Sequence, residues 1–373
     1  MPELSIPMSS AELDETDIEA VLGVLRSGRL ALGAKSVEFE RLMAEYIGVK
    51  HAIAVSSGTA ALHLLVRALN IGAGDEVIVP SFTFAASANA VLYERATPVF
   101  AEIETNTYNL DPDDVRRKIT PRTKAIMVVD VFGHPAEWDT LQQIADEHGL
   151  VLIDDSCEAL GAEYRGRKIG SFGAAGAFAF YPNKQMTTGE GGIIVTPDDH
   201  IAEMCRSLRN QGRGQMSAWL EHENLGYNYR LDEMSAALGV SQLQRIETFL
   251  AKRAAVAQMY TERLADFDWV RTPVIQPHVR MSWFVYVVTL ADGLDRDVVI
   301  ERMEARGVPA RGYFFPVHLQ PYVRRMLDTH DGQLPLTENI AGRTIALPFH
   351  NNLTRAQVEQ VVECLAAAVN DVA

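Results

Sequence analysis

Between residues 51 and 196 the sequence alternates short apolar segments with segments of helical periodicity, and this alternation is its strongest constraint on the fold. Strands that alternate with helices form a mainly parallel sheet, because each helix carries the chain back across the sheet. The predicted strands are His51–Val55, Glu76–Pro80, Pro98–Glu102, Ala125–Val131, Leu150–Asp154, Ala175–Tyr181 and Ile193–Thr196. The predicted helices between them are Ala60–Leu69, Ser87–Tyr93, Asp113–Ile119 and Trp138–His148. We therefore predict an α/β domain with a mainly parallel seven-stranded sheet flanked by helices.

Two helices are expected before this region. The first begins at Thr16-x-x-Glu19, which has the form of a capping box, and ends at Gly28. The second ends at Gly48. Both glycines follow the last apolar residue of a helical pattern, where glycine commonly ends a helix.

A smaller unit is expected after the sheet. A long helix is predicted from about Leu231 toward Leu264, followed by a strand at Met281–Leu290 and a helix at Asp295–Arg306. Thr354-x-x-Gln357 is predicted to open the final helix. We predict two domains: residues 1–250 form an N-terminal arm and a large α/β domain, and residues 251–373 form a small α+β domain.

The composition excludes several classes of protein. The net charge is −15 and no basic run is present, which argues against a nucleic-acid binder. No segment has the apolar length of a membrane span, and the acidic N-terminus lacks a signal-peptide pattern. Cys157, Cys205 and Cys364 have no zinc-ligand spacing, and such a sparse, odd set suits the reducing cytoplasm.

One lysine has surroundings that suit a nucleophile. Lys184 follows the apolar and aromatic run 174–181 and precedes a glycine-rich turn, so it is expected just after a strand. An amine beside apolar groups loses part of its preference for the charged form and then acts as a nucleophile. The alternative is a surface lysine with its amine in water.

A phosphate site is suggested where the first strand meets a helix. The turn Ser56-Ser57-Gly58-Thr59 offers free backbone amides and the positive end of a helix dipole. An ordinary Ser or Thr N-cap is an equally good interpretation of this turn. The turn lacks the lysine of a P-loop and the spacing of a dinucleotide fingerprint.

A carboxylate is predicted at the end of the fifth strand. Asp155 follows an apolar run, and a carboxylate there needs a partner. That partner is a protonated heteroaromatic nitrogen, or alternatively a metal or a helix end. An amine, a carboxylate and a phosphate cradle on adjacent strand ends are the set that pyridoxal phosphate requires.

These motifs together resemble a known family. The segments SSGTAALHL, PSFTF, IDDSCEALGA, FAFYPNKQMTTGEGG, GYNYRLDEMSAALG and PVHLQPY resemble the nucleotide-sugar aminotransferases of DegT/StrS type, which have the fold of type I pyridoxal-phosphate-dependent transferases. The likeness runs over essentially the whole chain. The stretch around Lys184 is its most specific part.

The resemblance implies a role for each of several residues. Lys184 is the Schiff-base lysine and proton shuttle, and Asp155 pairs with the pyridine nitrogen of the cofactor. Phe84 stacks on the ring, Gly58 and Thr59 hold the phosphate, and Asn228 reaches the phosphate of the neighbouring subunit in a homodimer. Tyr313 and His318 line the sugar-nucleotide pocket, although a histidine in a proline-flanked loop is equally well explained as a structural hydrogen bonder.

Two positions depart from the family pattern. Ala179 stands where a serine usually donates to the phosphate, and one donor fewer costs about 1–3 kcal/mol of binding if nothing replaces it. Glu158 stands in place of a glutamine beside the ring oxygen of the cofactor, so its carboxylate must be protonated, paired or turned away. We keep Glu158 as a cofactor contact.

The implied function is transfer of an amino group, with glutamate as donor, to a keto-sugar carried on a nucleotide diphosphate, in the cytoplasm. Pyridoxamine phosphate is the implied intermediate. A sugar dehydratase of the same family is disfavoured, because that branch typically has histidine at the position of Lys184. A keto-cyclitol or an aminohydroxybenzoate precursor as acceptor stays open. A regulatory relative that binds the cofactor without turnover is disfavoured by the intact Lys184 and Asp155.

Overall fold

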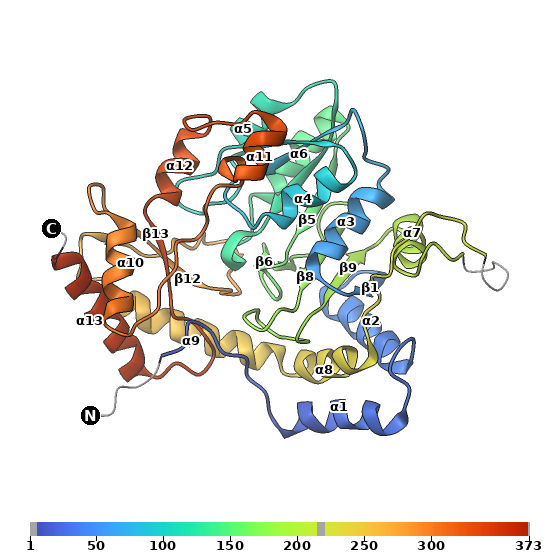
Figure 1. Ribbon diagram of the computed structural model, residues 1–373, viewed down its shortest axis with the longest axis horizontal. Helices are drawn as coiled ribbons and strands as arrows, with labels where there is room; N and C mark the ends of the chain where they lie inside the picture. The colour runs from blue at the N-terminus through green and yellow to red at the C-terminus, as the bar shows by residue number, and fades with distance from the viewer. Residues whose placement is uncertain (1–5, 215–220, 372–373) are drawn as a thin grey trace.

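A seven-stranded sheet is the centre of the computed structural model, which describes residues 6–214 and 221–371 (Figure 1). The strand order is β1-β9-β8-β5-β4-β2-β3, and only β9 runs antiparallel to its neighbours. The strands are β1 (His51–Val55), β2 (Glu76–Pro80), β3 (Thr97–Ala101), β4 (Thr123–Val129), β5 (Val151–Asp155), β8 (Ala175–Ala179) and β9 (Gly192–Thr196). The predicted mainly parallel sheet is confirmed, and each predicted strand boundary lies within two residues of the observed one.

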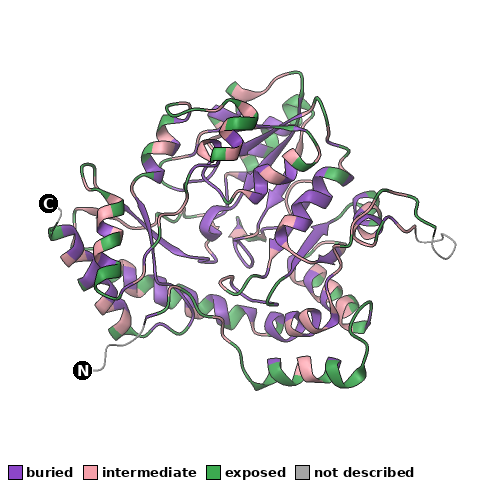
Figure 2. Ribbon diagram, viewed as in Figure 1, coloured by how far each residue is buried: buried purple, intermediate pink, exposed green. Residues whose placement is uncertain are grey.

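Helices cover both faces of this sheet. Because successive side chains of a strand point to opposite faces, Val77 and Val79 of β2 pack on one layer and Ile78 packs on the other. One layer contains α3 (Gly58–Ala68), α4 (Ala86–Tyr93) and α7 (Asp199–Arg209). The other contains α2 (Ala34–Ile47), α5 (Pro112–Lys118), α6 (Trp138–His148) and α8 (Glu233–Gln244). Because helices cover both faces, most residues of the seven strands are buried (Figure 2).

The first helix begins earlier than predicted. Helix α1 spans Glu15–Ser27, and its N-cap is Asp14, which forms a capping box with Asp17. Thr16 therefore lies inside the helix, and its amide donates to the side chain of Asp14 at 2.9 Å. A carboxylate accepts two amide hydrogen bonds here, which makes it a better cap than the threonine two residues later. The predicted ends at Gly28 and Gly48 are confirmed, since both have positive φ.

The predicted long helix is two helices. Helix α8 ends at Gln244, and α9 (Ile246–Leu264) follows after a break at Arg245. Leu250 of α9 belongs to the core beneath the sheet, whereas Val256 of the same helix belongs to a second core. On this change of packing we propose a domain boundary near residue 250.

The second core lies between α9 and the C-terminal elements. It is built from β12 (Tyr286–Leu290), β13 (Thr344–Leu347), α10 (Arg296–Ala305) and α13 (Arg355–Asn370). The predicted capping box of Thr354 and Gln357 at the start of α13 is confirmed. A short strand, β10 (Val270–Arg271), pairs with β12.

Part of the C-terminal region returns to the large sheet. Helices α11 (Pro321–Leu327) and α12 (Pro335–Ala341) belong to this part, and Val323 of α11 and Leu334, just before α12, join the core of the α3 layer. A small sheet, β11-β6-β7, comprises β6 (Glu163–Tyr164), β7 (Arg167–Lys168) and β11 (Val279–Arg280). Among the helices of residues 6–214 and 221–371, none combines the length and the apolar character that crossing a membrane requires.

Candidate active site

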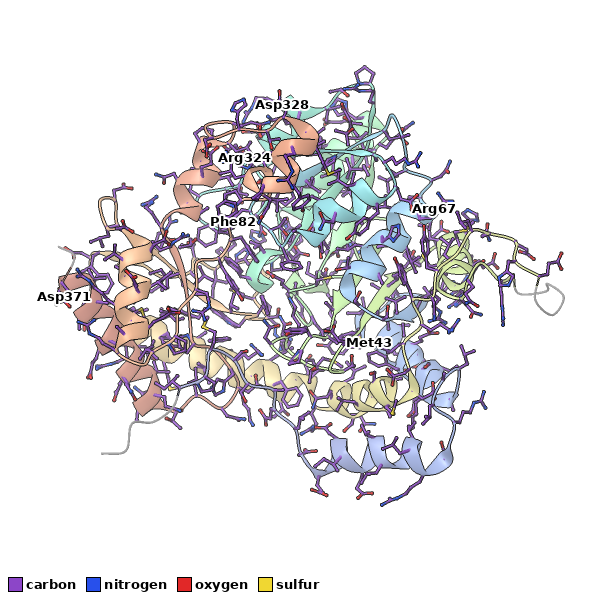
Figure 3. All side chains as sticks on the ribbon, viewed as in Figure 1. Met43, Arg67, Phe82, Arg324, Asp328 and Asp371 are labelled. Carbon is purple, nitrogen blue, oxygen red and sulfur yellow. The ribbon has the colours of Figure 1, made fainter. Side chains whose placement is uncertain are left out.

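A cavity of about 320 Å³ lies at the carboxyl ends of five strands that run in the same direction, β1, β2, β4, β5 and β8. Parallel strands bring their carboxyl ends to one edge of the sheet, where ligands of α/β proteins commonly bind. The C-terminal region closes the cavity with Phe284, Tyr313 and Phe314. By contrast Phe82, which also follows β2, is fully buried inside the molecule (Figure 3).

Lys184 lies inside this cavity. Its side chain is only 13% exposed, so the alternative of a surface lysine is wrong. The amide of Lys184 donates to the carbonyl of Tyr181 at 2.9 Å, which fixes the turn that follows β8. The Nζ atom lies 3.8 Å from the ring centre of Phe284 and 3.8 Å from Oε1 of Glu158. A primary amine is thus held between an aromatic face and a carboxyl group.

Asp155 ends β5 and faces the same cavity. The carboxylate is buried, and it accepts a hydrogen bond from the Ser87 hydroxyl at 2.6 Å and one from the Cys157 amide at 3.2 Å. The preceding residue, Asp154, points away and accepts from the amide of Gly170 at 2.8 Å, as alternation along a strand requires. Only one carboxylate of the pair is therefore available to a ligand in the cavity.

The start of α3 forms another wall. Ser57 is the N-cap of this helix, and its hydroxyl accepts from the amide of Ala60 at 3.1 Å, while Gly58 and Thr59 line the cavity. The turn can therefore serve both as an ordinary N-cap, formed by the Ser57 side chain, and as a phosphate site, formed by the backbone amides. The first amides of a helix have no partner within it and favour an anion. A Cβ on residue 58 would lie 2.7 Å from Cβ of Ala179, so glycine is required for this close packing.

Glu158 lies in the wall beside Lys184. Its Oε2 accepts from the amide of Phe132 at 2.9 Å. Burial raises the pKa of Glu158, although the charge of Lys184 and the Phe132 amide oppose this shift. The carboxyl group is therefore paired and not turned away from the cavity.

Phe84 and Tyr313 also line the cavity. Phe84 is 65% exposed, which is unusual for phenylalanine and leaves its ring available to a ligand. Burial raises the pKa of Tyr313, and the charge of Glu158 adds to this effect. The hydroxyl of Tyr313 thus stays protonated at neutral pH.

Asn228 lies outside the cavity lining. It is exposed and forms an isolated bridge with Asn210 near the end of α7. Its neighbours Tyr227 and Tyr229 stack on each other with ring centres 5.0 Å apart, and both rings contact His63. The structure therefore holds the backbone on either side of Asn228 and leaves its side chain on the surface.

His318 does not line the cavity, in contrast to the prediction. Its ring is fully buried, with Nδ1 2.6 Å from the Ser81 hydroxyl and Nε2 3.2 Å from the Glu338 carboxylate. Its amide also donates to the Ser81 hydroxyl at 3.0 Å. Both ring nitrogens are thus occupied by protein groups, which favours the alternative of a structural hydrogen bonder.

Several residues of the site were not predicted. Ser87 bonds Asp155 across 68 residues, and Phe284 comes from the region after the large domain. Cys157 lines the cavity as well, and burial raises its pKa well above the usual value of a thiol. The only sequence signal for Ser87 is its place three residues after Phe84, at the start of the helical segment that follows β2.

The residues present fit pyridoxal phosphate. Lys184 supplies the amine, Asp155 supplies a buried carboxylate held by two donors, and Gly58 and Thr59 supply amides at a helix N-terminus. No group of three or more His, Cys, Asp or Glu side chains suited to a metal ion is found among residues 6–214 and 221–371.

Comparisons with known proteins agree with this chemistry. Residues 11–366 match the DegT/DnrJ/EryC1/StrS aminotransferase family. The chain is 40% identical to GDP-perosamine synthase of Caulobacter vibrioides over 98% of both chains. It is 39% identical to dTDP-3-amino-3,4,6-trideoxy-alpha-D-glucose transaminase of Streptomyces venezuelae, covering 98% of this chain and 95% of the relative.

The fold has close counterparts among solved structures. DesV of S. venezuelae, in complex with a ketimine intermediate, superposes with a TM-score of 0.89 at 39% identity and 94% coverage of both chains. Another similar structure is the pyridoxal phosphate form of Spr1654 of Streptococcus pneumoniae, with a TM-score of 0.94 at 26% identity over 99% of this chain and 100% of that one. The predicted fold and cofactor are thereby confirmed, and the chain belongs to the DegT/DnrJ/EryC1/StrS aminotransferase family, whose members depend on pyridoxal phosphate.

Proposed function

We propose that this aminotransferase moves an amino group from L-glutamate to the keto group of a deoxysugar linked to a nucleotide diphosphate. The observation that carries the proposal is the amine of Lys184, whose side chain is largely shielded from solvent, in one cavity with the carboxylate of Asp155. The names of the two curated relatives, one with a GDP-sugar and one with a dTDP-sugar, support the class of acceptor. The product would enter amino-sugar biosynthesis.

Each residue has a separate task in this proposal. Pyridoxal phosphate, when bound, supplies an electron sink for the pair released at Cα of the amino donor. The amine of Lys184, the primary amine that lines the cavity, would take the proton from Cα of the donor and deliver it to C4′ of the cofactor. In the second half-reaction it would move a proton in the opposite direction, from C4′ to the carbon of the sugar that receives the nitrogen. Asp155 keeps the ring nitrogen of the cofactor protonated, because a buried carboxylate stabilises a facing positive charge.

Other residues orient the bound molecules. The amides of Gly58 and Thr59 would hold the phosphate, Phe84 would cover the cofactor ring, and Glu158 would contact the ring oxygen, since all four residues line the cavity. Tyr313 is assigned to the part of the cavity that takes the sugar. Its protonated hydroxyl would donate a hydrogen bond to the sugar there. His318 is assigned to the scaffold, where it joins Ser81 to Glu338.

Asn228 is assigned to the site of a second subunit in a homodimer. Its exposed side chain and firmly held neighbours suit a residue that reaches across an interface.

The three cysteines are free and the chain is acidic, which suits a reducing cytoplasm.

Visible absorbance tests the proposal. Purified protein with pyridoxal phosphate should be yellow, and glutamate should bleach the colour. Lys184→Ala should show neither effect, whereas Lys124→Ala, which removes an exposed lysine, should behave as wild type. The bleached protein should then regain its colour with a keto-sugar nucleotide.

The other outcomes separate the alternatives. Recovery of colour with a keto-cyclitol, but with no sugar nucleotide, would move the acceptor to that class. Colour that neither glutamate nor another amino donor changes would favour a regulatory relative without turnover.

A further inference from the structure

Arg253 is a buried cation in the interior of the molecule. It lies on α9 and is 2% exposed. Its Nη1 donates to the carbonyls of Trp283 and Phe284, each at 3.1 Å. Its Nη2 donates to the carbonyl of Lys184 at 2.9 Å and to that of Asn183 at 3.4 Å. One guanidinium thus binds four main-chain carbonyls.

These bonds are unusual for a buried arginine, which commonly pairs with a carboxylate. Among the described residues, 6–214 and 221–371, no ion pair is formed by Arg253. Burial lowers the pKa of Arg253 to about 10, and the charge of Glu12 opposes this shift, so the side chain is charged at neutral pH. A charged group kept in the interior without a salt bridge needs a reason beyond packing.

The carbonyls that Arg253 binds belong to two segments that meet at the amine. One segment carries Lys184 after β8, and the other carries Phe284 just before β12. The Nζ atom of Lys184 lies 3.8 Å from the ring centre of Phe284. Arg253 therefore joins the backbones of the two residues whose side chains touch in the cavity.

The backbone of the second segment also requires support. Trp283 has φ of +57°, a conformation that a bulky side chain rarely adopts. This kink turns two successive carbonyls, those of Trp283 and Phe284, toward the same nitrogen of Arg253. A planar guanidinium fork matches such a set of acceptors, whereas an ammonium group is a compact point charge that cannot span both segments.

We propose that Arg253 is a positioning residue that sets the place of the Lys184 amine relative to the Phe284 ring by holding the main chains of both. This inference rests on the proposed role of Lys184. It assigns Arg253 no contact with substrate or cofactor, because it is absent from the residues that line the cavity. Its loss should loosen the amine without removing any group that reacts.

The test compares full-length wild type with Arg253→Lys and Arg253→Met. Arg263→Met is the matched control, because Arg263 lies on the same helix, is partly exposed and forms a long ion pair of 3.9 Å with Glu359. Circular dichroism and thermal unfolding establish that each variant is folded. If Arg253→Met does not fold, Arg253→Lys decides the question, since lysine keeps the positive charge but lacks the planar guanidinium that binds both segments.

The first readout needs no bound cofactor. Protein freed of pyridoxal phosphate is treated with limiting acetic anhydride, and acetylation of Lys184 is measured by mass spectrometry against that of exposed Lys124. We expect Lys184 of the Arg253 variants to react on the order of tenfold faster, because its segment opens more readily. Hydrogen exchange should rise at the amides of Lys184 and Phe284, and Arg263→Met should change neither measure.

The second readout is the rate with cofactor and glutamate. The kcat of the Arg253 variants should fall by about 10–100-fold, as expected for a displaced reacting group, with KM for glutamate changed much less. Folded Arg253→Lys with wild-type acetylation and exchange at Lys184 and Phe284 would overturn the proposal. A wild type that never reacts with any amino donor would refute the proposed function alone, because the acetylation result would still judge Arg253.

Discussion

The Nζ atom of Lys184 lies 3.8 Å from Oε1 of Glu158, so the amine of the site has a carboxyl group beside it. The family resemblance implies a glutamine at this position, and a glutamine cannot ionise. Burial raises the pKa of Glu158 despite the positive charge of Lys184, so desolvation outweighs the attraction between the two. Glu158 consequently introduces a dependence on pH that a glutamine would lack.

Glu158→Gln should stabilise the cofactor-free chain at high pH. Because folding raises the pKa of this acid, the folded chain binds the proton more tightly than the unfolded chain, and stability falls as pH rises above the ordinary value of 4.5. The amide oxygen of glutamine can still accept from Phe132. We expect the free energy of unfolding to rise by on the order of 1 kcal/mol at pH 8, and by less at pH 5.

Urea unfolding of wild type and Glu158→Gln at pH 8 and at pH 5 measures this difference in the free energy of unfolding. Glu190→Gln is the control, because Glu190 also lines the cavity but is exposed. A loss of stability in Glu158→Gln at pH 8 would mean that the ion pair with Lys184 outweighs the cost of burial, contrary to the prediction.

Ser87→Ala should weaken the site through Asp155. The hydroxyl of Ser87 donates to the buried carboxylate at 2.6 Å, and only the Cys157 amide, at 3.2 Å, is described as a second donor. Loss of a hydrogen bond to a buried charged group costs about 1–3 kcal/mol. We expect lower stability by that amount and weaker binding of pyridoxal phosphate, measured by urea unfolding and by absorbance titration.

Ser171→Ala is the comparison for this prediction. The hydroxyl of Ser171 donates to the carbonyl of Lys168 at 2.6 Å, in a turn that does not line the cavity. Ser171→Ala should therefore leave the binding of pyridoxal phosphate unchanged. Equal cofactor affinity in wild type and Ser87→Ala would show that Asp155 does not need this bond.

The sheet, and the placement of Lys184 and Asp155 at one edge of it, were predictable from the sequence for one physical reason. Each strand is buried on both faces, so it appears as a continuous apolar run whose ends mark the edge of the sheet. Because parallel strands place their carboxyl ends together, Lys184 and Asp155 were expected in one place, and both line the cavity. Their assigned chemical roles are still predictions.

The remaining features depend on contacts that no local pattern records. The bond between Ser87 and Asp155 and those from Arg253 to the Lys184 segment join residues far apart in the chain. His318 was assigned to the pocket by the family resemblance alone, whereas in the structure Ser81 and Glu338 occupy its ring nitrogens. Such partners become visible only once the chain is folded.

Ala179→Ser should strengthen cofactor binding. Ala179 lines the cavity beside Gly58 and lacks the hydroxyl that the family resemblance implies for this position. A serine would add one donor near the helix N-terminus that we assign to the phosphate. We expect pyridoxal phosphate to bind roughly tenfold more tightly, which corresponds to about 1.4 kcal/mol.

Equilibrium titration of the cofactor-free protein measures this gain. Pyridoxal, which lacks the phosphate, is the matched ligand and should bind Ala179→Ser and wild type equally. A similar gain for pyridoxal would place the new hydroxyl away from the phosphate, and no gain for either ligand would show that the existing donors already suffice.

Gly58→Ala should disrupt both packing and cofactor binding. A Cβ at this position would lie 2.7 Å from Cβ of Ala179 and 2.9 Å from Sγ of Cys157, so β8 or the start of α3 must move. Overpacking of this kind costs about 1–3 kcal/mol of stability. Binding of pyridoxal phosphate should weaken as well, because the amides of residues 58 and 59 would shift.

A double variant separates this steric effect from other causes. Gly58→Ala combined with Ala179→Gly removes the shorter of the two clashes and should recover part of the lost stability and affinity. Gly23→Ala is the control, because a Cβ there meets nothing within 4 Å. Urea unfolding and cofactor titration of the three variants decide the matter: if the double variant is no better than Gly58→Ala alone, contact with Ala179 is not the reason that residue 58 is glycine.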